Sequence, residues 1–260
     1  MRVAEQIDLS GPDERHAQVA VPGRGIAAAY GGFSRTVRIP IGDVSLAADW
    51  AMHGEAAGIV LFAHGSGSSR HSARNQAVAK ALQQQGMGTL ILDLLTPGEE
   101  QVDLITGELR FDIGLLAARL AGATHWMQSR REALDLPLGY FGASTGGGAA
   151  LVAAANEGRV AAVVSRGGRP DLAGEALALV STPTLLIVGG NDHLVLNLSW
   201  KALARLHCPK SLTVIPGAGH LFEETGAMEQ VSALAARWFL KYFQTSSSCS
   251  IRGTERGGVS

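Results

Sequence analysis

The residues whose types and positions best suit catalysis are a serine, an aspartate and a histidine, each just after an apolar run. The serine lies in Gly142-Ala143-Ser144-Thr145-Gly146, a G-x-S-x-G pattern between a predicted strand and a predicted helix. A turn this tight forces its serine into strained backbone geometry, and flanking glycines prevent clashes across it. The pattern therefore predicts a nucleophilic hydroxyl at the end of a strand. The alternative is a glycine-rich turn that only permits close helix–strand packing.

A serine hydroxyl is a weak nucleophile until a base takes its proton, and the sequence offers eight histidines. His220 lies in the segment PGAGHLF, directly after the last predicted strand. A glycine-rich loop there lets the side chain reach back over the strand ends. His220 also follows Ser144 in the chain, as the order serine, acid, histidine requires. We therefore predict that His220 is the base.

The acid that orients the base should lie between these two residues at another strand end. Asp192 directly follows the apolar run PTLLIV and its glycines, and a buried carboxylate there would fix the imidazole tautomer. Asp171 also lies between them, but at the start of a predicted helix, where capping explains it. We therefore prefer Asp192. His193 is predicted to be exposed, and the pair lacks further residues with metal-ligand spacing.

A second glycine-rich loop, HGSGSSRH, follows the apolar run GIVLFA. A His-Gly-x-Gly loop at this place can supply a backbone donor to an oxyanion, so we predict an oxyanion hole from the N–H groups of Ser66 and Thr145. His64 is expected to brace the loop. Arg70 is a candidate substrate-binding residue, with a bracing contact to a carboxylate as the alternative. A phosphate cradle is disfavoured because the Gly-Lys pair and the third glycine are missing.

The apolar pattern alternates between strands and helices along most of the chain. The predicted strands are 35–41 and 44–51 (a hairpin), 58–63, 89–93, 137–141, 160–165, 183–188 and 211–215, and the predicted helices are 72–85, 111–132, 146–157, 196–206 and 228–242. Residues 94–110 are expected to be a loop. This alternation predicts an α/β fold whose mostly parallel central sheet has about eight strands and helices on both faces.

The domain organisation follows from the same pattern. Residues 34–244 are predicted to form one domain, preceded by a loosely ordered extension, 1–33, and followed by a disordered polar tail, 245–260. With 260 residues, 46% of them hydrophobic, the chain can form a sizeable core. The connection between the strands ending at Ser165 and starting at Pro183 is too short for a large cap domain, so a shallow pocket is expected.

Composition argues against several classes of partner. The net charge is -1 and there is no basic tail, which disfavours nucleic acid. The paired arginines of the sequence are expected to be solvated or ion-paired rather than part of a phosphate track: Arg130, Arg131, Arg166 and Arg169. Cys208 and Cys249 imply no disulfide, and neither a signal peptide nor a membrane span is expected, so the protein is predicted to be cytoplasmic.

These motifs together resemble the dienelactone-hydrolase-like branch of the α/β hydrolases. The matching segments span about residues 35–243: HGSGSSRHSARN, LDLLTPGEE, FDIGLLAARL, GYFGASTGGGAA, VVSRGGRPDLA, LLIVGGNDHLV and PGAGHLFEE. The resemblance implies the α/β-hydrolase fold, a Ser144–Asp192–His220 triad and an oxyanion hole at Ser66 and Thr145.

The chain departs from that family at the nucleophile. Dienelactone hydrolases proper use a cysteine where this chain has Ser144, so lactone specificity stays open. The sequence is also similar to serine-bearing relatives, some of them fused to phosphoribosyltransferase domains, and no such domain is expected here.

The expected function is hydrolysis of small carboxylic esters or lactones through an acyl-enzyme on Ser144. Two alternatives remain: an acyltransferase or perhydrolase with the same triad, and a non-catalytic small-ligand-binding protein. No metal or organic cofactor is expected. The expected partner is a small-molecule ester, with neither nucleic acid nor membrane, and a homodimer is a candidate assembly.

Overall fold

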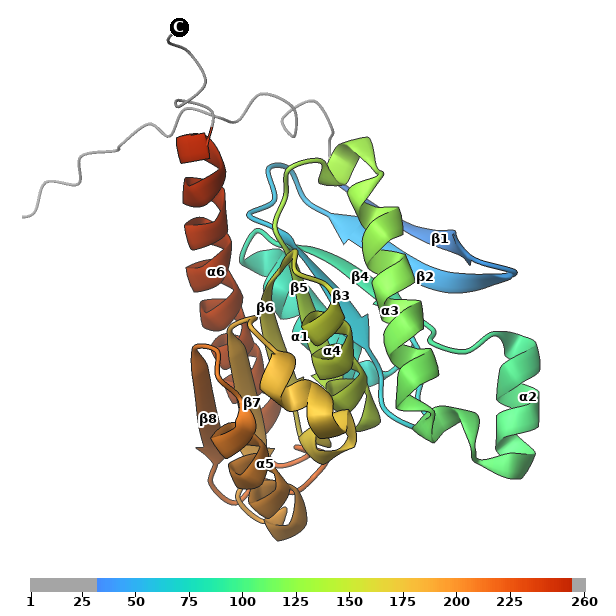
Figure 1. Ribbon diagram of the computed structural model, residues 1–260, viewed down its shortest axis with the longest axis vertical. Coiled ribbons are helices and arrows are strands. Elements are labelled where there is room, and N and C mark those ends of the chain that lie inside the picture. Colours follow the sequence, from blue (N-terminus) through green and yellow to red (C-terminus); the bar gives the residue numbers. More distant parts are fainter. Residues whose placement is uncertain (1–31, 254–260) are drawn as a thin grey trace, which may run out of the picture.

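The structure, a computed structural model, describes residues 32–253 and places eight strands in one sheet, in the order β1-β2-β4-β3-β5-β6-β7-β8 (Figure 1). The strands are β1 (Phe33–Ile41), β2 (Val44–Met52), β3 (Ile59–Ala63), β4 (Gly88–Leu92), β5 (Leu138–Ala143), β6 (Val160–Arg166), β7 (Thr184–Gly189) and β8 (Lys210–Ile215). The β1–β2 hairpin and the β2–β4 pair are antiparallel, and all other pairs are parallel. The predicted α/β fold is confirmed.

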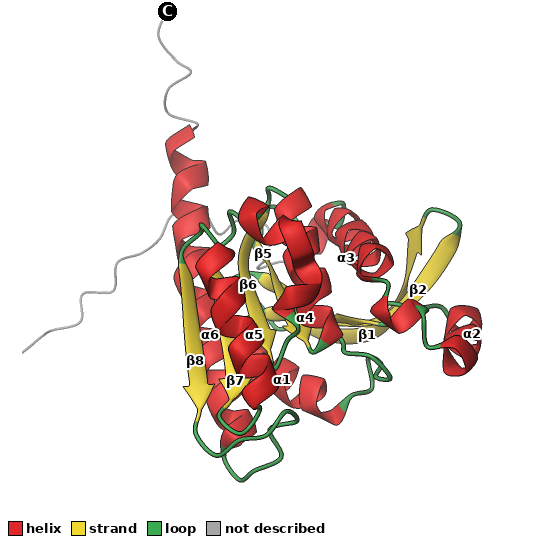
Figure 2. Cartoon of the chain, turned by 60° about the horizontal axis from the view of Figure 1, so that its bottom comes forward, coloured by secondary structure: helices red, strands yellow, loops and turns green. Residues whose placement is uncertain are grey.

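Helices cover both faces of this sheet (Figure 2). They are α1 (Ala73–Gln84), α2 (Pro97–Thr106), α3 (Ile113–Gln128), α4 (Thr145–Asn156), α5 (His193–Arg205) and α6 (Ala227–Gly253), with short 3-10 segments η2 (Leu109–Phe111), η3 (Arg131–Ala133) and η4 (Pro170–Leu179). The buried side chains of α1 and α6 share one apolar core, and those of α3, α4 and α5 share the other. Strands β3 to β7 are therefore buried on both faces, which explains their continuous apolar runs, whereas the edge strand β8 is partly exposed.

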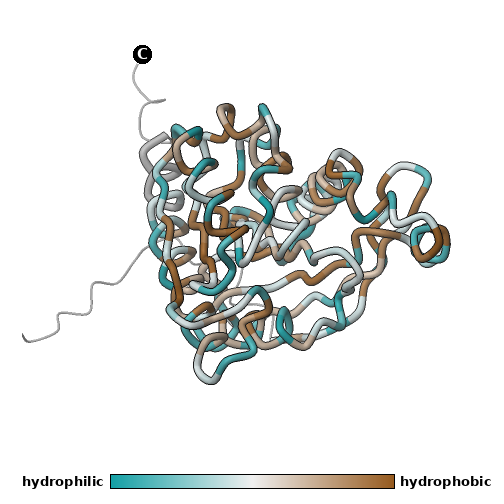
Figure 3. Tube along the Cα trace, turned by 90° about the horizontal axis from the view of Figure 1, so that it is seen from below, coloured by the Kyte–Doolittle hydropathy of each residue, from teal (hydrophilic) through white to brown (hydrophobic). Residues whose placement is uncertain are grey.

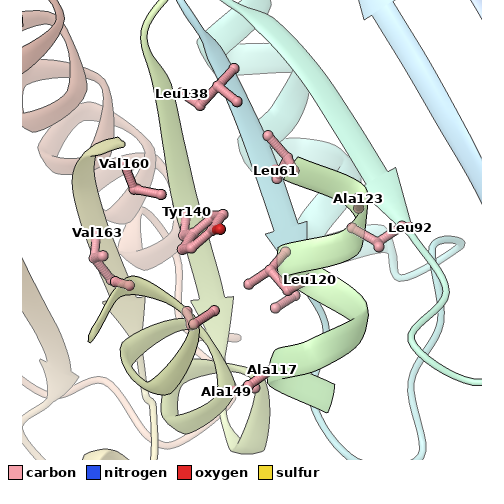
Figure 4. Close-up of a cluster of buried hydrophobic side chains, with 14 of the residues drawn as sticks. Leu61, Leu92, Ala117, Leu120, Ala123, Leu138, Tyr140, Ala149, Val160 and Val163 are labelled. Atoms are coloured by element: carbon pink, nitrogen blue, oxygen red, sulfur yellow. The ribbon is translucent and has the colours of Figure 1, made fainter. Parts of the chain in front are cut away.

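The core under α3 and α4 is built from alternate residues of neighbouring strands. Figure 4 shows Leu61, Tyr140 and Val163 pointing toward the same helices, among other labelled side chains of this cluster. Tyr140 is fully buried, and its hydroxyl forms a 2.6 Å hydrogen bond with the Thr124 hydroxyl on α3. The hydropathy trace shows hydrophobic stretches running through the middle of the molecule (Figure 3). This packing makes the sheet a firm support for the loops at its carboxyl edge.

Our prediction of a loop over residues 94–110 was wrong, because α2 and η2 lie within it. Thr96 and Glu99 form a reciprocal capping box, and Pro97 occupies the first helical position, where its missing N–H costs nothing. Gly107 ends the helix in the left-handed conformation. We interpreted these proline, glycine and acidic residues as turn signals, although they are also the signals that begin and end a helix.

The segment between β6 and β7, residues 167–183, contains η4 and no cap domain, as expected. The closing helix α6 extends to Gly253, so the first part of the expected disordered tail is helical. The expected N-terminal extension lies outside the described residues apart from its last two, and Phe33 already belongs to β1.

Cys208 is a buried free cysteine. In the described part of the chain, no helix is long and apolar enough to cross a membrane.

Candidate active site

Ser144 occupies a strained turn between β5 and α4. Its φ of 50° and ψ of -122° lie in a region that residues with a side chain rarely adopt. The Ser144 carbonyl accepts hydrogen bonds from the N–H groups of Gly147 and Arg169, both at 2.9 Å. These contacts hold the serine at the carboxyl end of β5, at the amino end of α4.

The two glycines of the G-x-S-x-G pattern are required by close backbone contacts. A Cβ at Gly146 would lie 2.2 Å from the Ala63 carbonyl oxygen and 2.5 Å from that of His64. A Cβ at Gly142 would lie 2.5 Å from the Gly146 carbonyl oxygen. Both distances are far below van der Waals contact. The first turn of α4 can therefore approach β3 and β5 only without side chains at these two positions.

We expect Gly146→Ala to lower the free energy of unfolding by about 3 kcal/mol or more, because the clash is with backbone that cannot move aside. Urea unfolding followed by circular dichroism measures the loss. The matched control is Gly158→Ala, because a Cβ at Gly158 meets nothing within 4 Å. A Gly146→Ala protein as stable as this control would show that the close approach of α4 to β3 is not needed.

His220 and Asp192 form a contact beyond the carboxyl ends of the neighbouring strands β8 and β7. The His220 Nδ1 lies 2.6 Å from the Asp192 Oδ2, with 11% of the Asp192 side chain exposed and 40% of the His220 side chain. The other carboxylate oxygen, Oδ1, accepts from the Val195 N–H at 3.2 Å and caps α5. Because the Nδ1–H donates to the carboxylate, the Nε2 of His220 is left as the proton acceptor.

Backbone contacts between two loops align this pair. The Asn191 N–H donates to the Ala218 carbonyl at 2.9 Å, and the Asn191 side chain donates to the Gly217 carbonyl at 2.7 Å. A Cβ at Gly167, the residue after β6, would lie 3.7 Å from the His220 Nδ1. The loop after β8 therefore folds back over β7 and places His220 beside the end of β6, the strand next to that of Ser144.

The alternative acid, Asp171, does not approach His220. Its two carboxylate oxygens accept from the Nε and Nη2 of Arg169 at 2.8 and 2.7 Å. We expected Asp171 to cap a helix, but at this position the structure has an ion pair at the start of η4. His193 is exposed at the first position of α5, as expected. Among the described residues, no cluster of His, Cys, Asp and Glu could hold a metal ion.

The loop after β3 packs directly on the serine turn. A Cβ at Gly65 would lie 2.9 Å from the Ser144 Cβ and 3.1 Å from the Ala143 carbonyl oxygen, so only glycine fits against the serine. Ser66 follows Gly65 in the chain, and Thr145 begins α4. Gly65 and Ser144 thus pack against each other, and the two residues predicted to supply the oxyanion donors, Ser66 and Thr145, come directly after them in the chain.

His64 braces this loop, as we expected. Its Nδ1 lies 2.9 Å from the Gly65 carbonyl oxygen, and its Nε2 accepts from the Leu94 N–H at 3.1 Å. Burial lowers the pKa of His64, against smaller opposing effects of the Gly65 hydrogen bond and Asp93. The imidazole is therefore neutral, and both ring nitrogens are used to join the loop after β3 to the loop after β4.

Arg70, the candidate substrate-binding residue, is also engaged by carboxylates. Its backbone N–H donates to the Asp93 Oδ1 at 2.7 Å, and its guanidinium Nη1 pairs with the Asp93 Oδ2. The guanidinium Nε lies 3.6 Å from the Asp49 Oδ2. These contacts favour the bracing interpretation over a contact with substrate.

A cavity of about 260 Å³ adjoins the serine turn, between residues 64–69, Thr145 and the α2–η2 segment. Leu104 and Arg110 are part of its lining. The Arg110 Nε donates to the Asp103 Oδ2 at 2.6 Å, which ties η2 to α2. Our sequence analysis missed these residues because it assigned no structure to the segment, although its capping box was a detectable signal.

Residues 55–247 match the family model described as "Dienelactone hydrolase family". Two curated proteins of Mycobacterium tuberculosis, both named "Putative phosphoribosyl transferase", are 53% identical over 207 residues, which is 79% of this chain and 46% of theirs. This chain thus spans about half the length of those relatives.

Two solved structures are similar to this chain over nearly their whole lengths. A dienelactone hydrolase from Anabaena variabilis is 55% identical with a TM-score of 0.80, covering 82% of this chain and 99% of its own. Est1E from Butyrivibrio proteoclasticus is 15% identical with a TM-score of 0.66, covering 80% of this chain and 99% of its own, a likeness of fold alone.

Proposed function

We propose that this chain, which belongs to the dienelactone hydrolase family, is a hydrolase that cleaves small carboxylic esters through an acyl-enzyme on Ser144. The observation that carries the proposal is the 2.6 Å contact between the His220 Nδ1 and the Asp192 Oδ2. This contact leaves the Nε2 of His220 ready to accept a proton at the same sheet edge as a strained, partly exposed serine. A glycine-rich packing turn would need neither the hydrogen bond between His220 and Asp192 nor the strain at Ser144.

In the first half-reaction, His220 removes the proton of Ser144 as the serine oxygen attacks the ester carbonyl. Asp192 holds the imidazole in the required tautomer and stabilises its cationic form. The negative charge that develops on the carbonyl oxygen is stabilised by the backbone N–H groups of Ser66 and Thr145, with support from the α4 dipole. Protonated His220 then gives its proton to the departing alcohol, which leaves Ser144 acylated.

In the second half-reaction, His220 removes a proton from water, which attacks the acyl carbonyl. The tetrahedral intermediate collapses, the Ser144 oxygen regains its proton from His220, and the carboxylic acid is released. An acyltransferase or perhydrolase would differ only in the acceptor that replaces water. None of these steps requires a metal or an organic cofactor from the chain.

The cavity beneath α2 supports a preference for short acyl groups. Its wall combines the apolar side chains of Leu95, Leu104 and Leu116 with polar residues that include Glu100. Burial, followed by the nearby Asp93, raises the pKa of Glu100, so this carboxylate is easier to protonate than an exposed one. Because the segment after β6 adds no cap domain, long chains would extend into solvent.

Hydrolysis of a p-nitrophenyl ester series from acetate to decanoate tests this proposal, combined with labelling by a fluorophosphonate probe. We expect the highest kcat/KM among the short esters and a single labelled serine, Ser144, identified by peptide mass spectrometry. Addition of a competing alcohol or hydrogen peroxide distinguishes transfer to another acceptor from hydrolysis. If no ester is cleaved and the probe does not label Ser144, the proposed function is wrong.

A further inference from the structure

Arg166 is the last residue of β6 and lies beside the serine turn. Its carbonyl oxygen accepts the Ser144 N–H at 3.4 Å, and its side chain lies 5.9 Å from the centre of the Phe222 ring. Only 7% of the residue is exposed. Val164, two residues earlier and so on the same face of the strand, belongs to the core under α1 and α6. The Arg166 side chain thus lies at the top of that core.

This buried guanidinium has no counter-charge in the described part of the chain. Its Nε and Nη1 are both buried without a hydrogen-bond partner. We expected Arg166 and Arg169 to be solvated or ion-paired, and Arg169 is paired with Asp171, but Arg166 is neither. Arg119, which is similarly buried, pairs with Glu99 at 2.7 Å. A buried charge is costly unless it is paired, so the unpaired state of Arg166 points to an anion from outside.

A second arginine, Arg74, lies near Arg166. Arg74 is the second residue of α1, and its Nε is also buried without a partner, while its Nη1 has a 3.4 Å contact with the exposed Glu223. Burial, followed by the charge of Arg74, lowers the pKa of Arg166 to about 10. The Arg166 guanidinium is therefore protonated at neutral pH, and it lies near enough to Arg74 for the charge of Arg74 to act on it.

We propose that Arg166 and Arg74 bind a phosphate group at the amino end of α1, beside His220. A phosphate dianion would neutralise both guanidiniums, accept several charge-assisted hydrogen bonds and interact favourably with the helix dipole. A carboxylate would supply half of that charge. This site is separate from the cavity under α2, whose lining includes neither arginine. Because Gly167 lies next to His220, a phosphate on the alcohol portion of an ester could reach it during the proposed reaction.

Thermal unfolding of the full chain in sodium phosphate, compared with sodium chloride of equal ionic strength, tests the site. We expect phosphate to raise the Tm of the wild type more than chloride does, because a ligand of the folded state stabilises it by mass action. Arg166→Met and Arg74→Gln should each weaken phosphate binding about tenfold or more, since each removes charged hydrogen-bond donors. In chloride alone, Arg166→Met should raise the Tm by removing an unpaired buried charge. Arg131→Gln, at an exposed arginine in η3, is the matched control and should keep the phosphate effect.

Equal Tm values of the wild type in the two salts would overturn the proposal. An unchanged phosphate effect in both Arg166→Met and Arg74→Gln would also overturn it, because the anion would then bind elsewhere. The Arg74→Gln variant decides the matter if Arg166→Met does not fold. Ser144→Ala should retain the effect of phosphate on the Tm. The phosphate site and the proposed ester hydrolysis are therefore tested independently of each other.

A second comparison identifies the source of the phosphate. The kcat/KM is measured for an aryl acetate with a phosphate on its alcohol portion and for its uncharged counterpart. A preference for the phosphorylated ester that Arg74→Gln removes would identify a substrate phosphate as the occupant. Equal rates, with the phosphate effect on Tm intact, would identify free inorganic phosphate.

Discussion

Ser144→Ala is expected to lower the kcat for p-nitrophenyl acetate by about 10⁶-fold, because removal of the nucleophile abolishes the acyl-enzyme route. A small residual rate should remain from the oxyanion donors, which are backbone N–H groups and survive the change. The measurement is a steady-state assay of the wild type and the variant side by side.

The fold should tolerate this substitution. The Ser144 backbone is held by hydrogen bonds from Gly147 and Arg169 to its carbonyl, which alanine retains, and alanine has the same Cβ as serine. We therefore expect an unchanged circular dichroism spectrum and a Tm close to that of the wild type. Ser45→Ala, at an exposed serine of β2 that does not line the cavity, is the matched control and should keep nearly full activity. A Ser144→Ala protein that retains more than about one hundredth of the kcat would contradict the acyl-enzyme mechanism.

Asp192→Asn should have the second largest effect, a loss of about 10⁴-fold in kcat. The Asp192 Oδ2 accepts from the His220 Nδ1 at 2.6 Å, whereas an asparagine amide would present a donor there or lose the contact. His220 would then favour the tautomer with its proton on Nε2, which cannot take a proton from Ser144. The KM should change much less than the kcat, because Asp192 does not line the cavity.

This substitution separates catalysis from stability, since Asp192 also caps α5. An asparagine side-chain oxygen can still accept from the Val195 N–H, so the cap and the Tm should be largely retained. Asp171→Asn is the control, because Asp171 was the rival candidate and pairs with Arg169 in the structure. If Asp171→Asn lost activity and Asp192→Asn kept it, the assignment of the orienting acid would be reversed.

Much of the fold could be predicted because its signals are local. Buried parallel strands require continuous apolar runs such as GIVLFA, and the helices between them show apolar periodicity. The hairpin at Gly42 and the helix start at Ser72 are both confirmed, since the side chain of Ser72 accepts from the Asn75 N–H at α1. The α2 helix escaped prediction because proline, glycine and glutamate signal helix ends and turns alike, and our interpretation chose the turn.

The sequence by itself determined the residue types and their order along the chain: a serine flanked by glycines, then an aspartate, then a histidine, each placed after a strand. Parallel strands bring such residues to one edge, so their convergence follows from the fold class. Only the tertiary structure decided which carboxylate contacts His220, that residues 97–106 form α2, and which buried arginine lacks a partner among the described residues. These facts depend on contacts between segments far apart in the chain, such as Asp192 with His220 or Arg166 with Phe222. Local pattern carries no information about such contacts, because they arise only when packing brings separate loops together.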